Sequence, residues 1–135
     1  MIHGIGTDLV QLRRMREALE RHGERFALRI LAASEVEAWR AHRDPARFLA
    51  KRFAAKEAFG KALGIGVAAP ATLPNIAVVH TASGQPFFEF SPELAAHLAE
   101  RGVGRAHLTL SDEAEYAVAF VVLETSGEPN SAITS

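Results

Sequence analysis

The stretch over residues 46–63 constrains the fold more than any other, because it is apolar almost all the way round a helix. At 100° per residue, Leu49, Phe53 and Leu63 share one stripe, and further apolar side chains occupy the other side. Those on the other side are Phe48, Ala55, Ala58, Phe59 and Ala62. A helix with so little polar surface is enclosed in the protein interior, so other elements must cover it on several sides.

Alternating patterns near both ends of the chain predict strands that could cover this helix. IHGIGTDL, residues 2–9, reads as a strand that places Gly4, Gly6 and Asp8 on one face. The two missing side chains leave room for a close approach beside the Asp8 carboxylate. NIAVVH and PFFEF around TASGQ predict one hairpin, and HLTLS and YAVAFVVLE around DEAE predict a second. The last run is so apolar and β-branched that we expect it to be covered on both faces.

Two capping patterns predict where the first helices begin. Apolar residues recur at helical spacing over residues 12–22, and Asp8 with Gln11 resembles a capping box before them. In that interpretation Asp8 is a helix cap and not a functional acid. A second helix is expected from Ser34, with Glu37 completing another capping box.

The order of these patterns predicts an α+β domain with a mostly antiparallel sheet packed against helices. A last helix is expected between Ser91 and Gly102, so the order is strand, helices, hairpin, helix, hairpin. A doubly wound nucleotide fold is disfavoured, since strands and helices do not alternate and the glycine-rich phosphate motifs are absent. We expect one domain over residues 1–124 and a disordered polar tail over residues 125–135.

The absence of cysteine limits the chemistry that this chain can perform. Disulfides, thiolate metal sites and cysteine nucleophiles are excluded, and any metal must be held by oxygen or histidine, which points towards hard cations. No apolar run approaches the roughly 20 residues that cross a bilayer, and the N-terminus lacks the pattern of a signal peptide. We therefore expect a cytoplasmic protein without a membrane partner.

Charge is divided unevenly along the chain, although the net charge is only −1. Residues 1–61 hold 13 basic against 8 acidic residues, a net charge of +5, and residues 62–135 hold 2 against 8, a net charge of −6. Six arginines between residues 11 and 31 carry much of the positive charge. A polyanionic or acidic partner and a solvated helix face with Arg–Glu pairs explain this pattern equally well.

Charged residues interrupt the apolar helix, and four of them matter most here: Arg52, Lys56, Glu57 and Lys61. An enclosed, unpaired carboxylate is strongly unfavourable, so Glu57 needs a cation or several donors. A Glu57–Lys61 pair four residues apart would satisfy both groups, but it leaves Lys56 one turn from the like charge of Arg52. A divalent cation on Glu57, with phosphates on Arg52 and the lysines, would satisfy all four groups. The residues alone leave both explanations open.

Three stretches, in this order and spacing, resemble a known family. They are GIGTDLVQLRRM at residues 4–15, RFLAKRFAAKEAFGKALG at residues 47–64 and HLTLSDEAEYAVAFVVLE at residues 107–124. The chain resembles the holo-acyl-carrier-protein synthases, the small 4'-phosphopantetheinyl transferases, over about residues 1–124. The central pattern F-x-x-K-E-x-x-x-K-A-[LM]-G together with the early G-[IL]-G-x-D is far more specific than either pattern alone.

The resemblance implies an activity and its site. Such enzymes transfer the 4'-phosphopantetheine arm of coenzyme A to a serine of apo acyl carrier protein in fatty acid biosynthesis, release adenosine 3',5'-bisphosphate and require Mg²⁺. It implies Asp8 and Glu57 as metal ligands and catalytic residues, with Lys61 and His107 as further catalytic residues at the pyrophosphate. The residues that it implies for coenzyme A binding are Arg52, Lys56, Lys61, Gly64, Ser83, Gly84, Pro86 and His107. The acceptor of the serine proton stays open among a magnesium-bound hydroxide, Glu57 acting through water, and His107.

The same resemblance implies a partner surface and an assembly. The basic helix after the first strand would dock the acidic apo acyl carrier protein, which would explain the uneven charge. The residues carried over as partner contacts are Arg14, Arg25, Phe26 and Arg29. A homotrimer with active sites between neighbouring protomers is implied as well.

Two positions depart from patterns of the wider family. Ser111 is followed by Asp112 where many relatives have histidine, so Asp112 either orients a polar group or begins the turn. Val10 stands where the larger branch of transferases carries a further acid, so water would fill that coordination position. This second departure favours the small trimeric branch.

Two other classes of protein compete with this interpretation. A nucleic-acid-binding module could use the arginine-rich helix for phosphate contacts. The basic half also holds Asp8 and Glu57, and no aromatic stacking motif accompanies it, so we expect no nucleic-acid partner. A magnesium-dependent nucleotide hydrolase would use water in place of the carrier serine.

Overall fold

The computed structural model describes residues 1–127. Their elements, in chain order, are β1 (Ile2–Gln11), α1 (Leu12–His22), α2 (Glu24–Ile30), the 3₁₀ helix η1 (Ala33–Glu35), α3 (Val36–Ala41), α4 (Pro45–Leu63), the 3₁₀ helix η2 (Leu73–Asn75), β2 (Ile76–His80), β3 (Pro86–Phe90), α5 (Pro92–Glu100), β4 (Val103–Asp112) and β5 (Tyr116–Thr125). β5 extends one residue past the predicted domain end at residue 124. Residues 128–135, most of the tail predicted to be disordered, lie outside the described residues.

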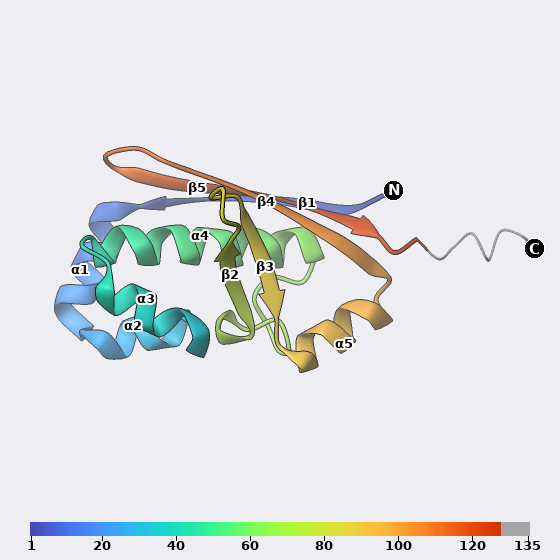
Figure 1. Ribbon diagram of the computed structural model, residues 1–135, viewed down its shortest axis with the longest axis horizontal. Coiled ribbons are helices and arrows are strands. Elements are labelled where there is room, and N and C mark those ends of the chain that lie inside the picture. The colour runs from blue at the N-terminus through green and yellow to red at the C-terminus, as the bar shows by residue number, and fades with distance from the viewer. Residues whose placement is uncertain (128–135) are drawn as a thin grey trace, which may run out of the picture.

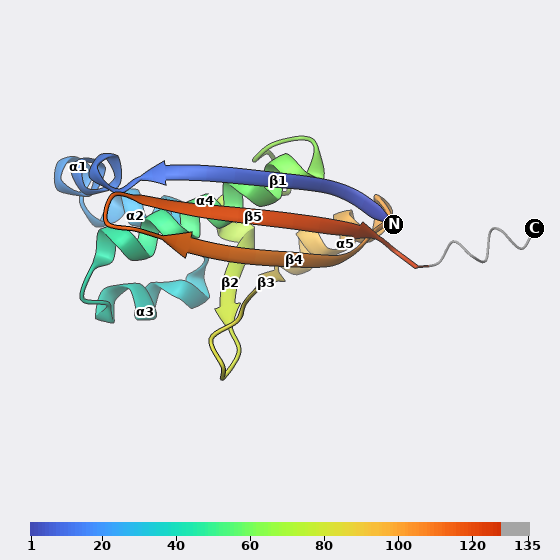
Figure 2. The same cartoon turned by 90° about the horizontal axis from the view of Figure 1, so that it is seen from above.

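The strands form two antiparallel units, which confirms the predicted α+β class. One is a three-stranded sheet in the order β1-β5-β4, and the other is the β2-β3 pair. Both predicted hairpins are present. The helices lie on one side of the three-stranded sheet, with α4 running directly beneath it (Figure 1). The β2–β3 hairpin projects past the β4 edge of the sheet, away from β1 (Figure 2).

The predicted apolar helix is α4, and it is enclosed as expected. It begins where the Asp44 side chain accepts a bond from the backbone N–H of Arg47, with Pro45 in the first turn. It ends at Gly64, whose φ of 95° suits glycine. β1 and β5 pack along one side of α4. On another side, Phe59 of α4 packs against Phe88 and Phe90 of β3. The ring centroids of these three residues are 5.0–5.6 Å apart.

Gly4 and Gly6 allow β1 to lie directly against α4. A Cβ atom at Gly4 would collide with the carbonyl oxygen of Ala62, and one at Gly6 would collide with that of Ala58. Only glycine permits this contact between strand and helix. The predicted close approach beside Asp8 is therefore confirmed, and the approaching element is α4 itself.

The capping boxes predicted at Asp8 and at Ser34 are both wrong. β1 continues past Asp8 to Gln11 because β5 pairs with it over this length, and no side chain caps α1. At the second place the backbone N–H of Ala32 donates to the Glu35 carboxylate, and a 3₁₀ turn precedes α3. Glu35 is thus drawn into the interior, where it has a further role described below.

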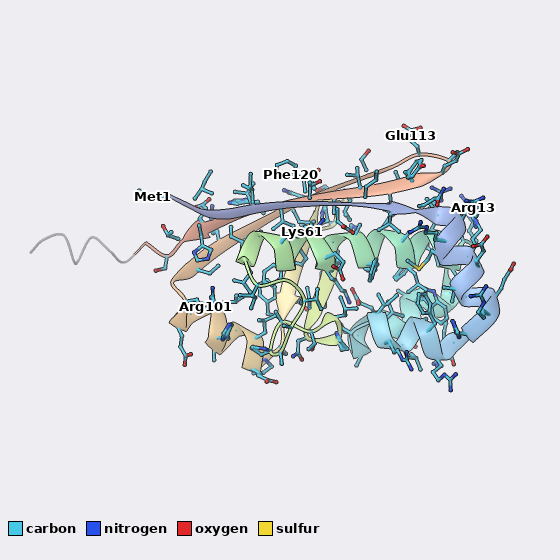
Figure 3. All side chains as sticks on the ribbon, turned by 180° about the vertical axis from the view of Figure 1, so that it is seen from behind. Met1, Arg13, Lys61, Arg101, Glu113 and Phe120 are labelled. Carbon is cyan, nitrogen blue, oxygen red and sulfur yellow. The ribbon has the colours of Figure 1, made fainter. Side chains whose placement is uncertain are left out.

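Within a single chain, the last strand is covered on one face only, contrary to expectation. Every second residue of β5 is buried on the side of α4, namely Ala117, Ala119, Val121 and Leu123. The intervening residues point the other way, and Phe120 is 44% exposed on the side of the sheet opposite the helices (Figure 3). Ile5 and Leu9 of β1 extend this uncovered apolar face.

Candidate active site

Asp8, Glu57 and Lys61 meet where β1 lies against α4. Asp8 is on the face of β1 that contacts α4, and Glu57 and Lys61 are one turn apart on that helix. Lys61 Nζ donates to Asp8 Oδ1 at 3.1 Å and to the carbonyl oxygen of Thr7 at 2.9 Å. Its side chain extends between the helix and the sheet (Figure 3). The alternative Glu57–Lys61 ion pair is replaced by this Lys61–Asp8 pair.

Glu57 is a carboxylate that the described part of the chain leaves without an ion-pair partner. Partial burial raises the pKa of Glu57, the negative charge of Asp8 raises it further, and Lys61 offsets only part of the effect. Two like charges therefore face one another across the strand and the helix. A bound cation would relieve this repulsion.

The donor atoms at this position fit a hard divalent cation. Mg²⁺ is typically bound by one or two carboxylates together with substrate phosphates and retained waters. Within residues 1–127, no cluster of three or more His, Cys, Asp or Glu residues could hold a metal. Asp8 and Glu57 are the two carboxylates here that could serve as protein ligands, with substrate or water oxygens completing the coordination.

A cavity of about 700 Å³ opens beside the two acids and connects them to the basic helices. Three of the four residues predicted to contact a carrier protein line it: Arg14 of α1, and Phe26 and Arg29 of α2. Arg25 is exposed on α2 and is not part of the lining. The sequence pattern ended the first helix at residue 22 but did not predict α2, which follows a turn at Gly23 with a φ of 67°.

Lys56 faces away from this cavity, so its predicted contact with phosphate is wrong. Its side chain is 0% exposed, and its Nζ donates to Glu35 Oε1 at 2.6 Å and to the carbonyl oxygen of Ile30 at 2.7 Å. Burial lowers the pKa of Lys56 to about 8, against the opposing effect of Glu35. The sequence could not reveal this role, because the two partners lie 21 and 26 residues away.

Arg52 is largely committed to the same carboxylate. Its Nε lies 3.1 Å from Glu35 Oε2, and its guanidinium carbon lies 4.1 Å from the ring centroid of Phe48. The Nε is not aligned for a hydrogen bond, so the attraction to Glu35 is mainly electrostatic. The remaining surface of Arg52 lines a small basic hollow beside Lys51 and His80.

His107 lies away from Asp8 within a single chain. It is opposite Val122 on β5, which in turn is opposite Ile5 on β1, so these three residues share the uncovered face of the sheet. Asp8 belongs to the other face. His107 Nε2 lies 2.6 Å from Glu124 Oε2, so the imidazole has a partner on its own side.

The other residues predicted to bind coenzyme A are also divided. Gly64 follows the last turn of α4, close in sequence to Lys61. Ser83 and Gly84 form the turn of the β2–β3 hairpin, and Pro86 begins β3. Figure 2 shows this turn beyond the edge of the sheet opposite to β1. One chain therefore does not bring the hairpin turn to Asp8.

Asp112 takes part in a second cluster that the sequence did not predict. Its carboxylate lies 2.7 Å from Arg47 Nη1 and 3.3 Å from Lys51 Nζ. Partial burial opposes ionisation, but the hydrogen bond from Arg47 and the charge of Lys51 hold the pKa of Asp112 below its usual value. Asp112 thus ties the β4–β5 turn to α4. The partners are up to 65 residues apart in sequence, so only the fold brings them together.

Comparison with known proteins assigns the chain to a class of enzymes. The sequence model of one family, the 4'-phosphopantetheinyl transferase superfamily, matches residues 4–121. The chain belongs to this family, and the resemblance noted in the sequence is confirmed.

Individual relatives narrow the class further. The holo-[acyl-carrier-protein] synthase of Azoarcus sp. (strain BH72) is 66% identical over 125 residues, 93% of this chain and 99% of that protein. The crystal structure of holo-[acyl-carrier-protein] synthase from Neisseria meningitidis matches with a TM-score of 0.91 at 44% identity, over 93% of this chain and 100% of that one. A holo-(acyl-carrier-protein) synthase from Bacillus anthracis, in complex with CoA (3',5'-ADP), matches with a TM-score of 0.78 at 34% identity, over 93% and 99%.

Across residues 1–127, none of the helices combines the length and the apolar character needed to cross a bilayer.

Proposed function

We propose that this chain transfers 4'-phosphopantetheine from coenzyme A to a serine of apo acyl carrier protein and releases adenosine 3',5'-bisphosphate. Membership of the transferase family and 66% identity with the Azoarcus synthase support the reaction. The observation that carries the proposal is the meeting of Asp8, Glu57 and Lys61 beside a cavity that Arg14 and Arg29 also line. The lining of this cavity thus combines two carboxylates that could bind a metal ion with two arginines that could bind an acidic protein.

The chain's own residues supply positioning and charge in the transfer step. Asp8 and Glu57 would hold Mg²⁺, and the bound ion would neutralise part of the pyrophosphate charge. Lys61 is 54% exposed on its side chain, so its ammonium can contact a phosphate oxygen while it stays beside Asp8. Phosphoryl transfer depends mainly on such positioning and charge neutralisation.

The reaction forms one bond and breaks one. The serine oxygen attacks the phosphorus that carries the pantetheine arm, and the bond from this phosphorus to the bridging oxygen breaks. Adenosine 3',5'-bisphosphate leaves with that oxygen. The serine proton passes to a base, and the chain's own candidates for this role are Glu57, acting through a water, and His107.

The basic helices would receive the carrier protein. Arg14 and Arg29 place positive charge on the cavity wall, and Phe26 supplies an apolar contact between them and the core. Arg25 extends the positive surface outside the cavity. Complementary charge of this kind speeds association and fixes the orientation of an acidic partner.

A homotrimer would complete the active site. Ile5 and Leu9 are 58% and 64% exposed on the uncovered face of the sheet, beside Phe120. A contiguous apolar patch on a folded chain marks an interface. The β1 edge carries Asp8 and the β4 edge lies towards the hairpin turn, so packing of neighbouring sheets would bring His107 and the turn of one copy towards Asp8 of the next.

Incubation of the protein with coenzyme A, Mg²⁺ and an apo acyl carrier protein tests the reaction. We expect the carrier to gain the mass of one phosphopantetheine and to release an equal amount of adenosine 3',5'-bisphosphate. Release of the bisphosphate without carrier would instead identify a nucleotide hydrolase. No mass gain on any acidic apo carrier would contradict the proposal.

Mixed assemblies test whether the site is shared between copies. Asp8→Asn and His107→Ala are each expected to be inactive or weak alone. Co-expressed, they should recover part of the activity, because some interfaces then combine an intact Asp8 with an intact His107. Sedimentation should show a trimer for the wild type and smaller species for Phe120→Glu. Absence of recovery, with a monomeric wild type, would rule out the shared site.

A further inference from the structure

We propose that Lys56 is a positioning residue of the transfer reaction, because it fixes the end of α2, with its carrier-protein contacts, relative to Glu57 on α4. This inference rests on the proposed function. Lys56 does not touch the cavity, so its effect would act through the backbone of α2 and the helix that carries Glu57.

The bond to α2 is short and fully enclosed. Lys56 Nζ donates to the carbonyl oxygen of Ile30 at 2.7 Å, and Ile30 is the last residue of α2. Carbonyl groups at a helix C-terminus lack partners within the helix, and a cation there is also favoured by the helix dipole. The side chain of Lys56 is 0% exposed, so water does not compete for this bond.

Glu35 holds the Lys56 ammonium in place. Its Oε1 accepts from the backbone N–H of Ala32 at 2.8 Å as well as from Lys56, and its Oε2 accepts from the backbone N–H of Val78 at 2.8 Å. Arg52 adds a second positive charge beside Oε2. The carboxylate is therefore anchored by two backbone groups from separate segments. A buried ion network of this kind contributes defined geometry more than stability.

The path from the carrier contacts to the metal ligand is short. Arg29 precedes Ile30 in α2, and Glu57 follows Lys56 in α4. The hydrogen bond from Lys56 to Ile30 therefore links the neighbour of Arg29 to the neighbour of Glu57. On the opposite side of α4, the glycines of β1 hold the helix against Asp8 independently of Lys56. Lys56 should thus govern the placement of α2 without governing the placement of Asp8.

Replacement of Lys56 by methionine tests the positioning role. Lys56→Met keeps an unbranched apolar side chain, one heavy atom shorter, that cannot bond to Ile30 or Glu35. We expect kcat/KM for apo carrier protein to fall by about 10²-fold, the size expected for misplacement of about 1 Å distant from the reaction. KM for coenzyme A should stay close to the wild-type value. Direct titration of apo carrier protein, without coenzyme A or Mg²⁺, should show weaker binding.

Trp39→Phe provides a control for general destabilisation. It removes the bond from Trp39 Nε1 to the carbonyl oxygen of Pro45, which joins α3 to the start of α4. This change weakens the attachment of α3 to α4 and leaves the bond from Lys56 to Ile30 in place. At a temperature where thermal melts show both variants folded, Trp39→Phe should retain the wild-type KM values for both substrates.

A second substitution applies if Lys56→Met does not fold. Lys56→Gln removes the charge and is too short to reach the carbonyl of Ile30, while Glu35 keeps Arg52 and its two backbone donors, so we expect the same selective loss in kcat/KM for the carrier. Unchanged carrier kinetics in the folded variant, or equal losses for carrier and coenzyme A, would overturn the positioning role. Failure of the wild type to transfer phosphopantetheine at all would instead refute the proposed function.

Discussion

Two neighbouring residues of α4, Lys56 and Glu57, have opposite surroundings. Lys56 lies in a closed cluster in which Glu35 and the end of α2 satisfy it completely. Glu57 faces a cavity beside Asp8, lacks an ion-pair partner in the described part of the chain and has a raised pKa. The closed cluster serves the fold. The open pair of acids stays unfavourable until a ligand arrives, which is the sign of a binding site.

The two lysines of the helix show the same contrast. Lys56 is 0% exposed, whereas the side chain of Lys61 is 54% exposed while it bonds to Asp8. Both occupy similar positions in the sequence pattern. The difference teaches that charge within an apolar helix does not itself identify a ligand site, because a partner from elsewhere in the chain can satisfy it.

The largest effect is expected from neutralising the open acid. Glu57→Gln removes a charge but little volume, so we expect kcat to fall by about 10²–10³-fold or more, comparable to loss of a key electrostatic contact in other enzymes. The melting temperature should not decrease, because the substitution also removes a repulsion with Asp8. Glu37→Gln, at an exposed position of α3, provides the matched control. Near-normal turnover of Glu57→Gln in Mg²⁺ would show that the open pair of acids has no more part in the reaction than the closed cluster at Lys56.

The contact that holds α4 against Asp8 is expected to have the next largest effect. In Gly6→Ala the new Cβ collides with the carbonyl oxygen of Ala58, so the helix must move away from β1. We expect the free energy of unfolding in urea to fall by about 1–3 kcal/mol, with lower activity. Gly127→Ala is the control, because no other part of residues 1–127 lies within 4 Å of the added carbon. An unchanged urea midpoint for Gly6→Ala would contradict the close packing.

Charge reversal on the cavity wall should change carrier binding selectively. Arg14→Glu places a negative charge where an acidic partner would dock, so we expect KM for the carrier protein to rise about tenfold, equivalent to about 1.4 kcal/mol. KM for coenzyme A should change far less. Arg13→Glu makes the same charge change on the neighbouring residue, which does not line the cavity. Equal increases in both KM values would argue against a docking surface at Arg14.

The smallest effect concerns pH. Because the pKa of Glu57 is raised by burial and by Asp8, the carboxylate becomes protonated at a higher pH than an ordinary glutamate. Metal ligands must be deprotonated, so the Mg²⁺ concentration for half-maximal rate should rise as the pH falls through this raised pKa. The measurement is a set of Mg²⁺ titrations of the transfer rate between neutral and mildly acidic pH.

Without Mg²⁺, the contribution of Glu57 to the stability of the fold should decrease as the pH rises. A carboxyl group with a raised pKa in the folded state stabilises the fold most below its unfolded value, and this contribution is lost as the pH rises through the folded value. Wild type should therefore lose stability relative to Glu57→Gln over that window. Parallel melting curves for the two proteins across this range would contradict the raised pKa.

Local patterns predicted much of the fold. The alternation in both hairpins, the helical spacing over residues 12–22 and the apolar stretch of α4 all gave the correct elements. Gly4 and Gly6 also predicted a close approach. The capping boxes were wrong because strand pairing and the inward turn of Glu35 outweighed the local cap preferences. The last strand is covered on one face only within a chain, because an apolar pattern does not distinguish a core face from one left for another copy.

The site was harder to predict than the fold. The family patterns pointed to Asp8, Glu57 and Lys61, which the structure brings together. They could not reveal that Lys56 pairs with Glu35, since that partner comes from a distant turn. They also could not show that His107 lies on the other face of the sheet, because the register of three strands decides it.

Cation binding tests the central claim most directly. Titration of Mn²⁺ in place of Mg²⁺, with coenzyme A present, can be followed by calorimetry for wild type, Asp8→Asn and Glu57→Gln. We predict one cation per active site for the wild type and a strong loss of affinity in each variant. Equal affinity in all three proteins would show that the cation is held elsewhere, and that the open pair of acids is not the metal site.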